Sequence, residues 1–175
     1  YDEKKLRAEL AGIRTLSTHT PQDFRPQLRE ALARCGVGFV LQKHLPKTYV
    51  NGATFWLAQD KAVLIMSLRG SWADIFWFSL FHEIGHLVLH DRRHTFLENT
   101  ADDPQWKKQE HEADAFARDT LIPPTQYARF MARRELTTAT IRSFAEDLGV
   151  PPGIVVGRLQ HDKILEPHQQ NGLRG

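Results

Sequence analysis

The longest apolar stretch of the sequence spans residues 72–90 and contains the pattern His82-Glu83-Ile84-Gly85-His86. Its length and composition predict a helix that is buried on most sides. Positions four apart lie on one face of a helix, so both imidazoles can point at a single metal ion. Two histidines and a glutamate are costly to bury without partners. A metal ion supplies such partners, and we therefore expect a metal centre within the folded domain.

Glu83 lies beside His82 in sequence but about 100° around the helix, where its carboxylate can reach a water at the metal rather than the metal itself. A zinc metallopeptidase requires two nitrogen ligands, an open position on the metal and a carboxylate that accepts the proton of the bound water. We predict a Zn2+ site with His82 and His86 as ligands and Glu83 as the general base. The alternative, a chance match to the pattern, is typical of polar surface helices and is disfavoured by the apolar surroundings.

His90 continues the row of histidines four residues further on. On an unbroken helix it lies about 12 Å from His82 along the axis, too far to share one ion. We expect His90 to interact with the carbonyl groups at the end of the helix instead.

A third ligand is expected from the next predicted helix, where Glu110 and Asp114 are four residues apart and share a face. We predict Glu110 as the ligand, with Glu112 as the alternative and His111 as a weaker one. Asp114 is expected to accept the ring N–H of one histidine and so to orient it. A solvated acidic helix face is the competing interpretation. The small side chains of Ala113 and Ala117 would let the two helices approach closely.

Periodicity and turn signals predict an α+β fold, mainly helical, with a small sheet of about three mainly antiparallel strands beside the 72–90 helix. A hairpin is expected at Gln59-Asp60, a turn at Asn51-Gly52, and a helix start at Ser71. We expect helices at residues 3–16, 21–35, 72–90, 106–121, 124–134, 138–148 and 152–161, and strands at 37–42, 53–57 and 62–68.

The 175 residues suit one domain with small additions. We divide them into a linker or N-terminal helix (1–20), a zinc peptidase core (21–135), a C-terminal helix-turn-helix-like segment (136–165) and a frayed tail (166–175). The net charge of +2 is too small to indicate the basic surface that nucleic-acid binding requires. No apolar run is long enough for a membrane span, and no signal peptide is recognisable. The single Cys35 excludes an intrachain disulfide, which is compatible with a reducing cytoplasm.

HEIGHLVLH at residues 82–90, followed by EHEADAFARDTLIP at residues 110–123, resembles the ImmA/IrrE family of metallopeptidases. The flanking SWADIFWFSLFHEIGH and LGVPPGIVVGRLQHDKI are similar to members fused behind a HigA-type helix-turn-helix antitoxin. The resemblance implies a zincin-like fold, a gluzincin-like metalloendopeptidase with His82, His86 and Glu110 as zinc ligands, and Glu83 as the catalytic base. Asp114 stands where the family often has Asn.

The resemblance also implies a cytoplasmic protein that acts on a transcriptional repressor or a toxin-antitoxin component, without direct nucleic-acid contact by this domain. Since the sequence opens with Tyr1, we expect a DNA-binding domain before it. The substrate is expected to add as a strand to an edge formed by residues 62–69. Candidates for the oxyanion donor are His111, Arg118 and Tyr127. The alternative function is a non-catalytic regulatory or antitoxin module that retains the metal site, which the intact Glu83 disfavours.

Overall fold

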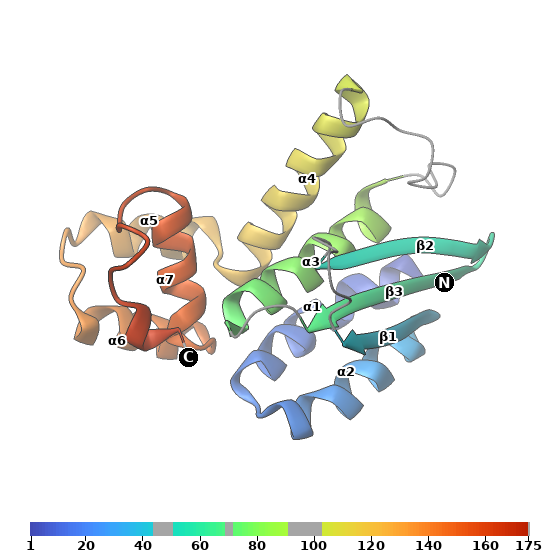
Figure 1. Cartoon of the computed structure of the whole chain (residues 1–175), viewed down its shortest axis with the longest axis horizontal. Helices are drawn as coiled ribbons and strands as arrows, with labels where there is room; N and C mark the ends of the chain where they lie inside the picture. The colour runs from blue at the N-terminus through green and yellow to red at the C-terminus, as the bar shows by residue number, and fades with distance from the viewer. Residues whose placement is uncertain (44–50, 69–71, 91–102, 175) are drawn as a thin grey trace.

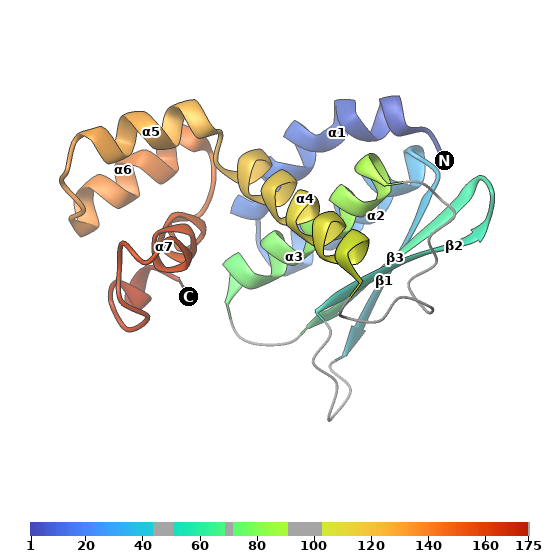
Figure 2. The ribbon, with the colours of Figure 1, turned by 90° about the horizontal axis from the view of Figure 1, so that it is seen from above.

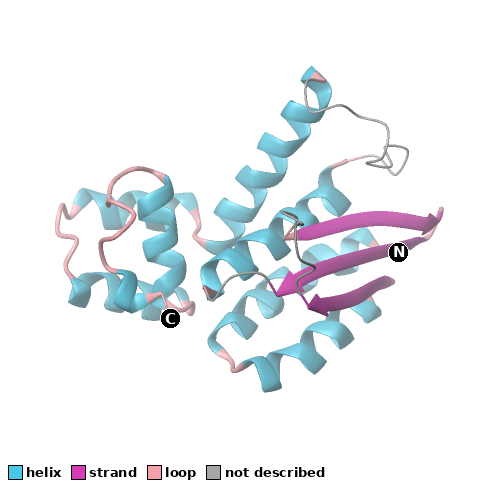
Figure 3. Ribbon diagram, in the orientation of Figure 1, coloured by secondary structure: helices cyan, strands magenta, loops and turns pink. Residues whose placement is uncertain are grey.

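A computed structural model of the chain describes residues 1–43, 51–68, 72–90 and 103–174. A three-stranded sheet with helices α1–α4 forms one part of the molecule, and helices α5–α7 gather beyond one end of α4 (Figure 1). The bounds are α1 Glu3–Thr15, α2 Pro21–Arg34, β1 Val37–Lys43, β2 Gly52–Ala58, β3 Lys61–Leu68, α3 Ala73–Leu89, α4 Pro104–Leu121, α5 Pro124–Ala132, α6 Thr138–Leu148 and α7 Pro152–His161, with short 3₁₀ turns at Leu16–Thr18 and Asn171–Leu173. The mainly helical α+β class is confirmed (Figure 3).

The sheet has the strand order β1-β3-β2 and is mixed. The predicted hairpin at Gln59-Asp60 is confirmed, because β2 pairs antiparallel with β3 on either side of it. β3 also pairs parallel with β1, so the expectation of a mainly antiparallel sheet is wrong for that pair. β3 therefore lies between β2, its partner in the hairpin, and β1. Alternation of apolar residues reports that a segment is a strand, but it carries no information about the neighbour or its direction.

The position of β3 corrects a second expectation. Residues 62–68 form a strand that is bonded on both sides, and therefore they cannot accept a further strand; Arg69 lies outside the described residues. Within the described chain, β2 is an edge strand, and it lies beside α3 (Figure 2).

Helix α3 is the central element of the fold and packs against α1, α4, α7, β2 and β3. Its apolar side chains fill the core, with Trp77, Leu80, Phe81 and Ile84 at most 2% exposed. Gly85 allows α4 to approach, since a Cβ there would lie only 3.2 Å from the Cα of Ala113. The expected close approach of the two helices at small residues is therefore confirmed.

The start of α3 differs from the prediction. Ser71, the expected capping residue, lies outside the described residues, and the N-cap is Trp72, without a side-chain hydrogen bond. Asp74 instead pairs with Arg174, whose guanidinium lies 2.7 Å from its carboxylate. This ion pair and the buried Leu173 hold the end of the chain against the fold, so the expectation of a frayed tail is wrong. Among the described residues, no helix has the length and apolar character that crossing a membrane requires.

Candidate metal centre

Three donor atoms from α3 and α4 converge on one point. The Nε2 atoms of His82 and His86 are 3.0 Å apart. Oε2 of Glu110 lies 3.5 Å from Nε2 of His82, and Oε1 of Glu110 lies 3.2 Å from Nε2 of His86. The structure thus brings together the three residues predicted as ligands, which form a group able to hold a metal ion.

The spacing of these atoms fits a tetrahedral ion. Zinc binds His nitrogen and carboxylate oxygen at about 2.0–2.2 Å, which places neighbouring ligands of a tetrahedron about 3.3–3.6 Å apart. The observed separations of 3.0–3.5 Å, two of which involve different oxygens of Glu110, lie within or slightly below this range. Two imidazoles and one carboxylate also match the donor set of a catalytic zinc site, which keeps its fourth position open.

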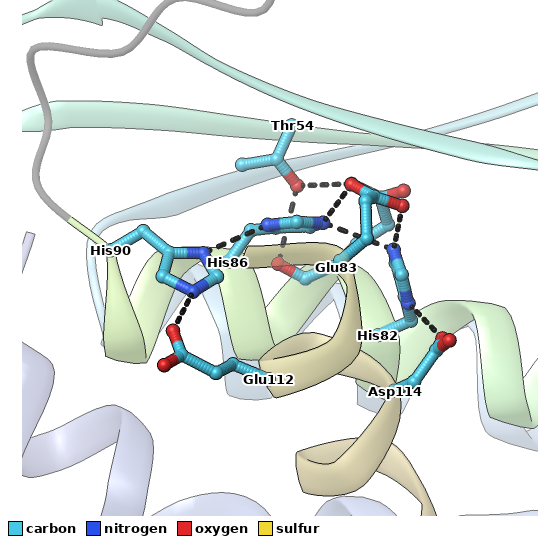
Figure 4. Close-up of polar contacts among 8 residues, drawn as sticks. Thr54, His82, Glu83, His86, His90, Glu112 and Asp114 are labelled. Atoms are coloured by element: carbon cyan, nitrogen blue, oxygen red, sulfur yellow. Dashed lines mark hydrogen bonds and ion pairs between the residues drawn. The ribbon is translucent and has the colours of Figure 1, made fainter. Parts of the chain in front are cut away.

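Asp114 orients the first histidine. Its carboxylate lies 2.8 Å from Nδ1 of His82, and a carboxylate accepts, so Nδ1 carries the hydrogen (Figure 4). The lone pair of Nε2 consequently faces His86 and Glu110. With neither a metal ion nor a proton on the facing histidine nitrogens, electron-rich atoms would meet there, an arrangement that is unfavourable in a partly buried site.

A second polar chain supports His86 from behind. Its Nδ1 lies 3.0 Å from Nδ1 of His90, and Nε2 of His90 lies 3.2 Å from the Glu112 carboxylate (Figure 4). The expectation that the His90 ring interacts with the helix-end carbonyls is therefore wrong. α3 ends at Leu89, and the extended backbone of His90 turns its ring towards His86. Glu112, the alternative ligand, is engaged with His90 and, at 3.7 Å, with Lys108.

Glu110 is ionised as metal binding requires, whereas a protonated His82 would have to release its proton. Burial alone would raise the pKa of Glu110, but hydrogen bonds to the two histidines outweigh it and lower the pKa to about 2. Burial lowers the pKa of His82, while Glu110, Glu83 and Asp114 together raise it above the ordinary value. Glu110 is therefore a carboxylate throughout the neutral range, and it loses no proton when it binds a cation.

Glu83 is held between α3 and β2. Its carboxylate accepts a hydrogen bond from the Thr54 hydroxyl at 2.8 Å, and the residue is only 8% exposed (Figure 4). Burial raises the pKa of Glu83, and Thr54, His86 and His82 act in the opposite direction. A carboxylate with a raised pKa is a better proton acceptor, as a general base requires.

Sequence reasoning missed the two β2 residues that fix Glu83. Thr54 is 29 residues away, so no local pattern connects them. Gly52 was expected in a turn, but it is the first residue of β2. A Cβ on Gly52 would lie 2.7 Å from Cγ of Glu83, so glycine leaves the space that this side chain occupies.

The centre opens into a cavity of about 540 Å³, lined by β2, α3 and α4. The Trp106 ring stacks against that of His86 with centroids 6.4 Å apart and forms part of the lining. The three candidate oxyanion donors lie elsewhere. His111 and Arg118 line a neighbouring cavity. The Tyr127 hydroxyl donates a hydrogen bond at 2.8 Å to the carboxylate of Asp162, the residue that follows α7.

The comparisons with known proteins agree with this centre. The family model Peptidase_M78, described as the IrrE N-terminal-like domain, matches residues 73–160, about half of the chain. The matched segment begins with α3 and ends within α7, so it includes the ligand group and Glu83. A search of curated proteins found no match. The chain therefore belongs to the family of peptidases defined by the IrrE N-terminal-like domain.

Proposed function

We propose that the chain is a zinc-dependent endopeptidase that acts on a protein substrate. One observation carries the proposal: a convergent His82, His86 and Glu110 group lies in the same cavity as the buried carboxylate of Glu83. A site that only stored a metal ion would need the three ligands but would not need the Glu83 carboxylate beside them. Family membership supports peptidase chemistry at this centre.

The roles of the side chains follow from their positions. His82, His86 and Glu110 would hold zinc, which, when bound, supplies a Lewis acid for a water molecule and for the scissile carbonyl. Glu83 accepts a proton from the attacking water and returns it to the leaving amine. The Thr54 hydroxyl keeps the Glu83 carboxylate in one orientation between these two transfers.

The edge of β2 offers a place for an extended peptide. The Ser67 amide donates to the Asn51 carbonyl at 2.8 Å, which identifies these residues as a hydrogen-bonded pair of the antiparallel ladder. Because bonded and non-bonded pairs alternate, the N–H and C=O groups of Gly52 and Thr54 point away from β3. Both residues line the cavity, so a peptide added at this edge would pass beside Glu83.

The resemblance to antitoxin-linked members supports a more specific proposal. The substrate is a transcriptional repressor or a toxin-antitoxin component, and the cleavage takes place in the cytoplasm. We propose no direct nucleic-acid contact by this domain, because Arg158 of the helix-turn-helix-like segment is paired with Asp162 at 2.6 Å and stacks on Tyr127.

Glu83→Gln tests the proposal directly. The substitution preserves size and removes the base, so we expect retained zinc and a loss of peptide cleavage of at least about 100-fold. Zinc content is measured by elemental analysis, and cleavage with a quenched fluorescent peptide library. Glu146→Gln, an exposed residue of α6, is the matched control and should behave as wild type. A Glu83→Gln protein that keeps zinc and full biological activity would favour the non-catalytic regulatory module.

A further inference from the structure

A second cavity adjoins the metal centre on the side of the C-terminal helices. It has a volume of about 460 Å³ and is lined by α3, α4 and α7. Asn51, Phe78, Ser79 and Asp114 line both cavities, so the two spaces are contiguous. A peptide bond held at the metal centre would therefore have one of its neighbouring side chains at the mouth of this second cavity.

The wall of the second cavity is mostly apolar. α3 contributes Ile75 and Phe78, which are half-buried, and the end of α4 contributes Leu121 and Ile122, which are at most 3% exposed. Ile154 of α7 also lines the cavity and is 4% exposed. Burial of an apolar side chain against such a wall is favourable, and a cavity of this volume suits a large one.

Two carboxylates that line this cavity already have partners within the protein. The Asp74 carboxylate is paired with Arg174 at 2.7 Å, and Asp114 accepts from His82 at 2.8 Å. A charged ligand group would have to compete with these contacts.

The two guanidinium groups at the cavity are paired as well. Arg158 lies 2.6 Å from Asp162, and Arg118 lies 2.7 Å from Asp119. The imidazoles of His111 and His161 also line the cavity, and His161 lies 3.3 Å from Asp162. Because the four charged groups are already paired, shape and apolar contact select the ligand.

We propose that this second cavity is a specificity subsite that takes one large apolar side chain, such as leucine or phenylalanine, next to the scissile bond of the substrate. The proposal rests on the proposed peptidase function and deepens it by naming the substrate residue. It also gives α7 a role in substrate selection, since Ile154 and Arg158 of this helix line the subsite.

Binding is tested with the full-length, zinc-loaded Glu83→Gln protein, which cannot consume its ligand. The probes are capped alanine pentapeptides that differ only in the middle residue, which is Phe, Leu, Asp or Lys. Chemical-shift changes of backbone amides report where and how tightly each peptide binds. We expect the Phe and Leu peptides to shift the amides of Ile75, Leu121 and Ile154, and to bind about 10-fold or more tightly than the Asp peptide.

Two substitutions at Ile75 then change the volume of the subsite. Ile75→Trp fills it and should abolish the advantage of the Phe peptide, whereas Ile75→Ala enlarges it and should keep that advantage. Ile164→Ala is the matched control, because Ile164 is 45% exposed and is not among the residues that line the cavity. Thermal melts of each variant establish that it is folded. If Ile75→Trp does not fold, the comparison of the Phe and Asp peptides on the Glu83→Gln protein still tests the subsite.

The outcomes separate the subsite from the peptidase function. Equal binding of the Asp and Phe peptides, or an undiminished Phe preference in Ile75→Trp, would overturn the subsite. Cleavage by the Glu83-intact protein that ignores the apolar residue would overturn it too, while leaving the proposed function standing. Selective binding of the Phe peptide at Ile75 and Ile154 would support the apolar site. If the protein with Glu83 intact then cleaved no peptide, the peptidase function would be contradicted while the apolar site would stand.

Discussion

Gly52 faces the general base of the proposed reaction, and Gly52→Ala is therefore a substitution at the site that touches no metal ligand. An added Cβ would lie 2.7 Å from Cγ of Glu83 and 2.9 Å from Sδ of Met66. Carbon atoms in contact prefer separations of about 3.5–4.0 Å, so the Glu83 side chain or the strand must move by about 1 Å. Met66 is fully buried, which leaves Glu83 as the group with room to move towards the cavity.

A displacement of about 1 Å of a catalytic group can lower the rate about 100-fold, which corresponds to about 2.7 kcal/mol of transition-state stabilisation. We expect this loss in kcat/KM for peptide cleavage, with zinc content unchanged. The φ angle of Gly52 is not in the left-handed region, so backbone strain does not contribute to the loss. A loss in kcat/KM would therefore report the displacement of the Glu83 side chain.

Gly38→Ala provides the matched control in the same sheet. A Cβ on Gly38 would meet its nearest atoms at 3.5 and 3.7 Å, which is ordinary contact. We expect wild-type cleavage and stability for this variant. Full activity in Gly52→Ala would refute the reasoning, since Glu83 would then not need the position in which it is found. A loss of zinc would refute it as well, because no ligand is displaced.

Three further outcomes are expected. Removal of zinc with a chelator should lower the melting temperature, because zinc at 1,000 times its Kd stabilises the folded protein by about 4 kcal/mol; Glu110→Gln should abolish most of that difference in calorimetry. His90→Ala should weaken zinc binding about 10–100-fold in competition titrations, because His90 contacts the ring of His86; unchanged affinity would show that this contact is incidental. Burial raises the pKa of Asp162, but the hydrogen bonds from Arg158, Tyr127 and His161, with the charge of Arg158, together outweigh it and lower the pKa. A lowered pKa stabilises the fold above the unfolded-state pKa, so Asp162→Asn should cost about 1 kcal/mol at pH 7 in urea titrations. That cost should disappear as the pH falls through the acidic range, and a cost that persists at low pH would contradict the electrostatic origin.

Elements with strong local signals were predicted well. α6 and α7 begin and end at the predicted residues, 138–148 and 152–161, because proline, glycine and helical periodicity all act over a few residues. The convergence of the two α3 histidines also follows from local geometry, since residues four apart share a helix face. The choice of Glu110 over Glu112 was supported by its spacing from Asp114 and by the family resemblance, and the structure places Glu110 against both histidines.

Other features lie beyond any local pattern. The partner of β3 on its second side depends on which strand reaches it in space, so the parallel pairing with β1 was not foreseen. The turn of His90 towards His86 required the helix to end at Leu89, whereas the prediction assumed an unbroken helix. The contact of Asp74 with Arg174 joins residues 100 positions apart. Each of these depends on how the elements pack and not on their own sequences.

The sequence by itself determined the chemistry available to this protein: which side chains occur, and which of them share a helix face, because helical geometry repeats every few residues. Only the tertiary structure decided how that chemistry is arranged. It brought Glu110 of α4 to the histidines of α3, and Thr54 and Gly52 of β2 to Glu83. It also brought α7 to the side of the metal centre. These approaches arise from burial of apolar surface, which is non-directional and therefore leaves no spacing in the sequence from which the partner can be identified.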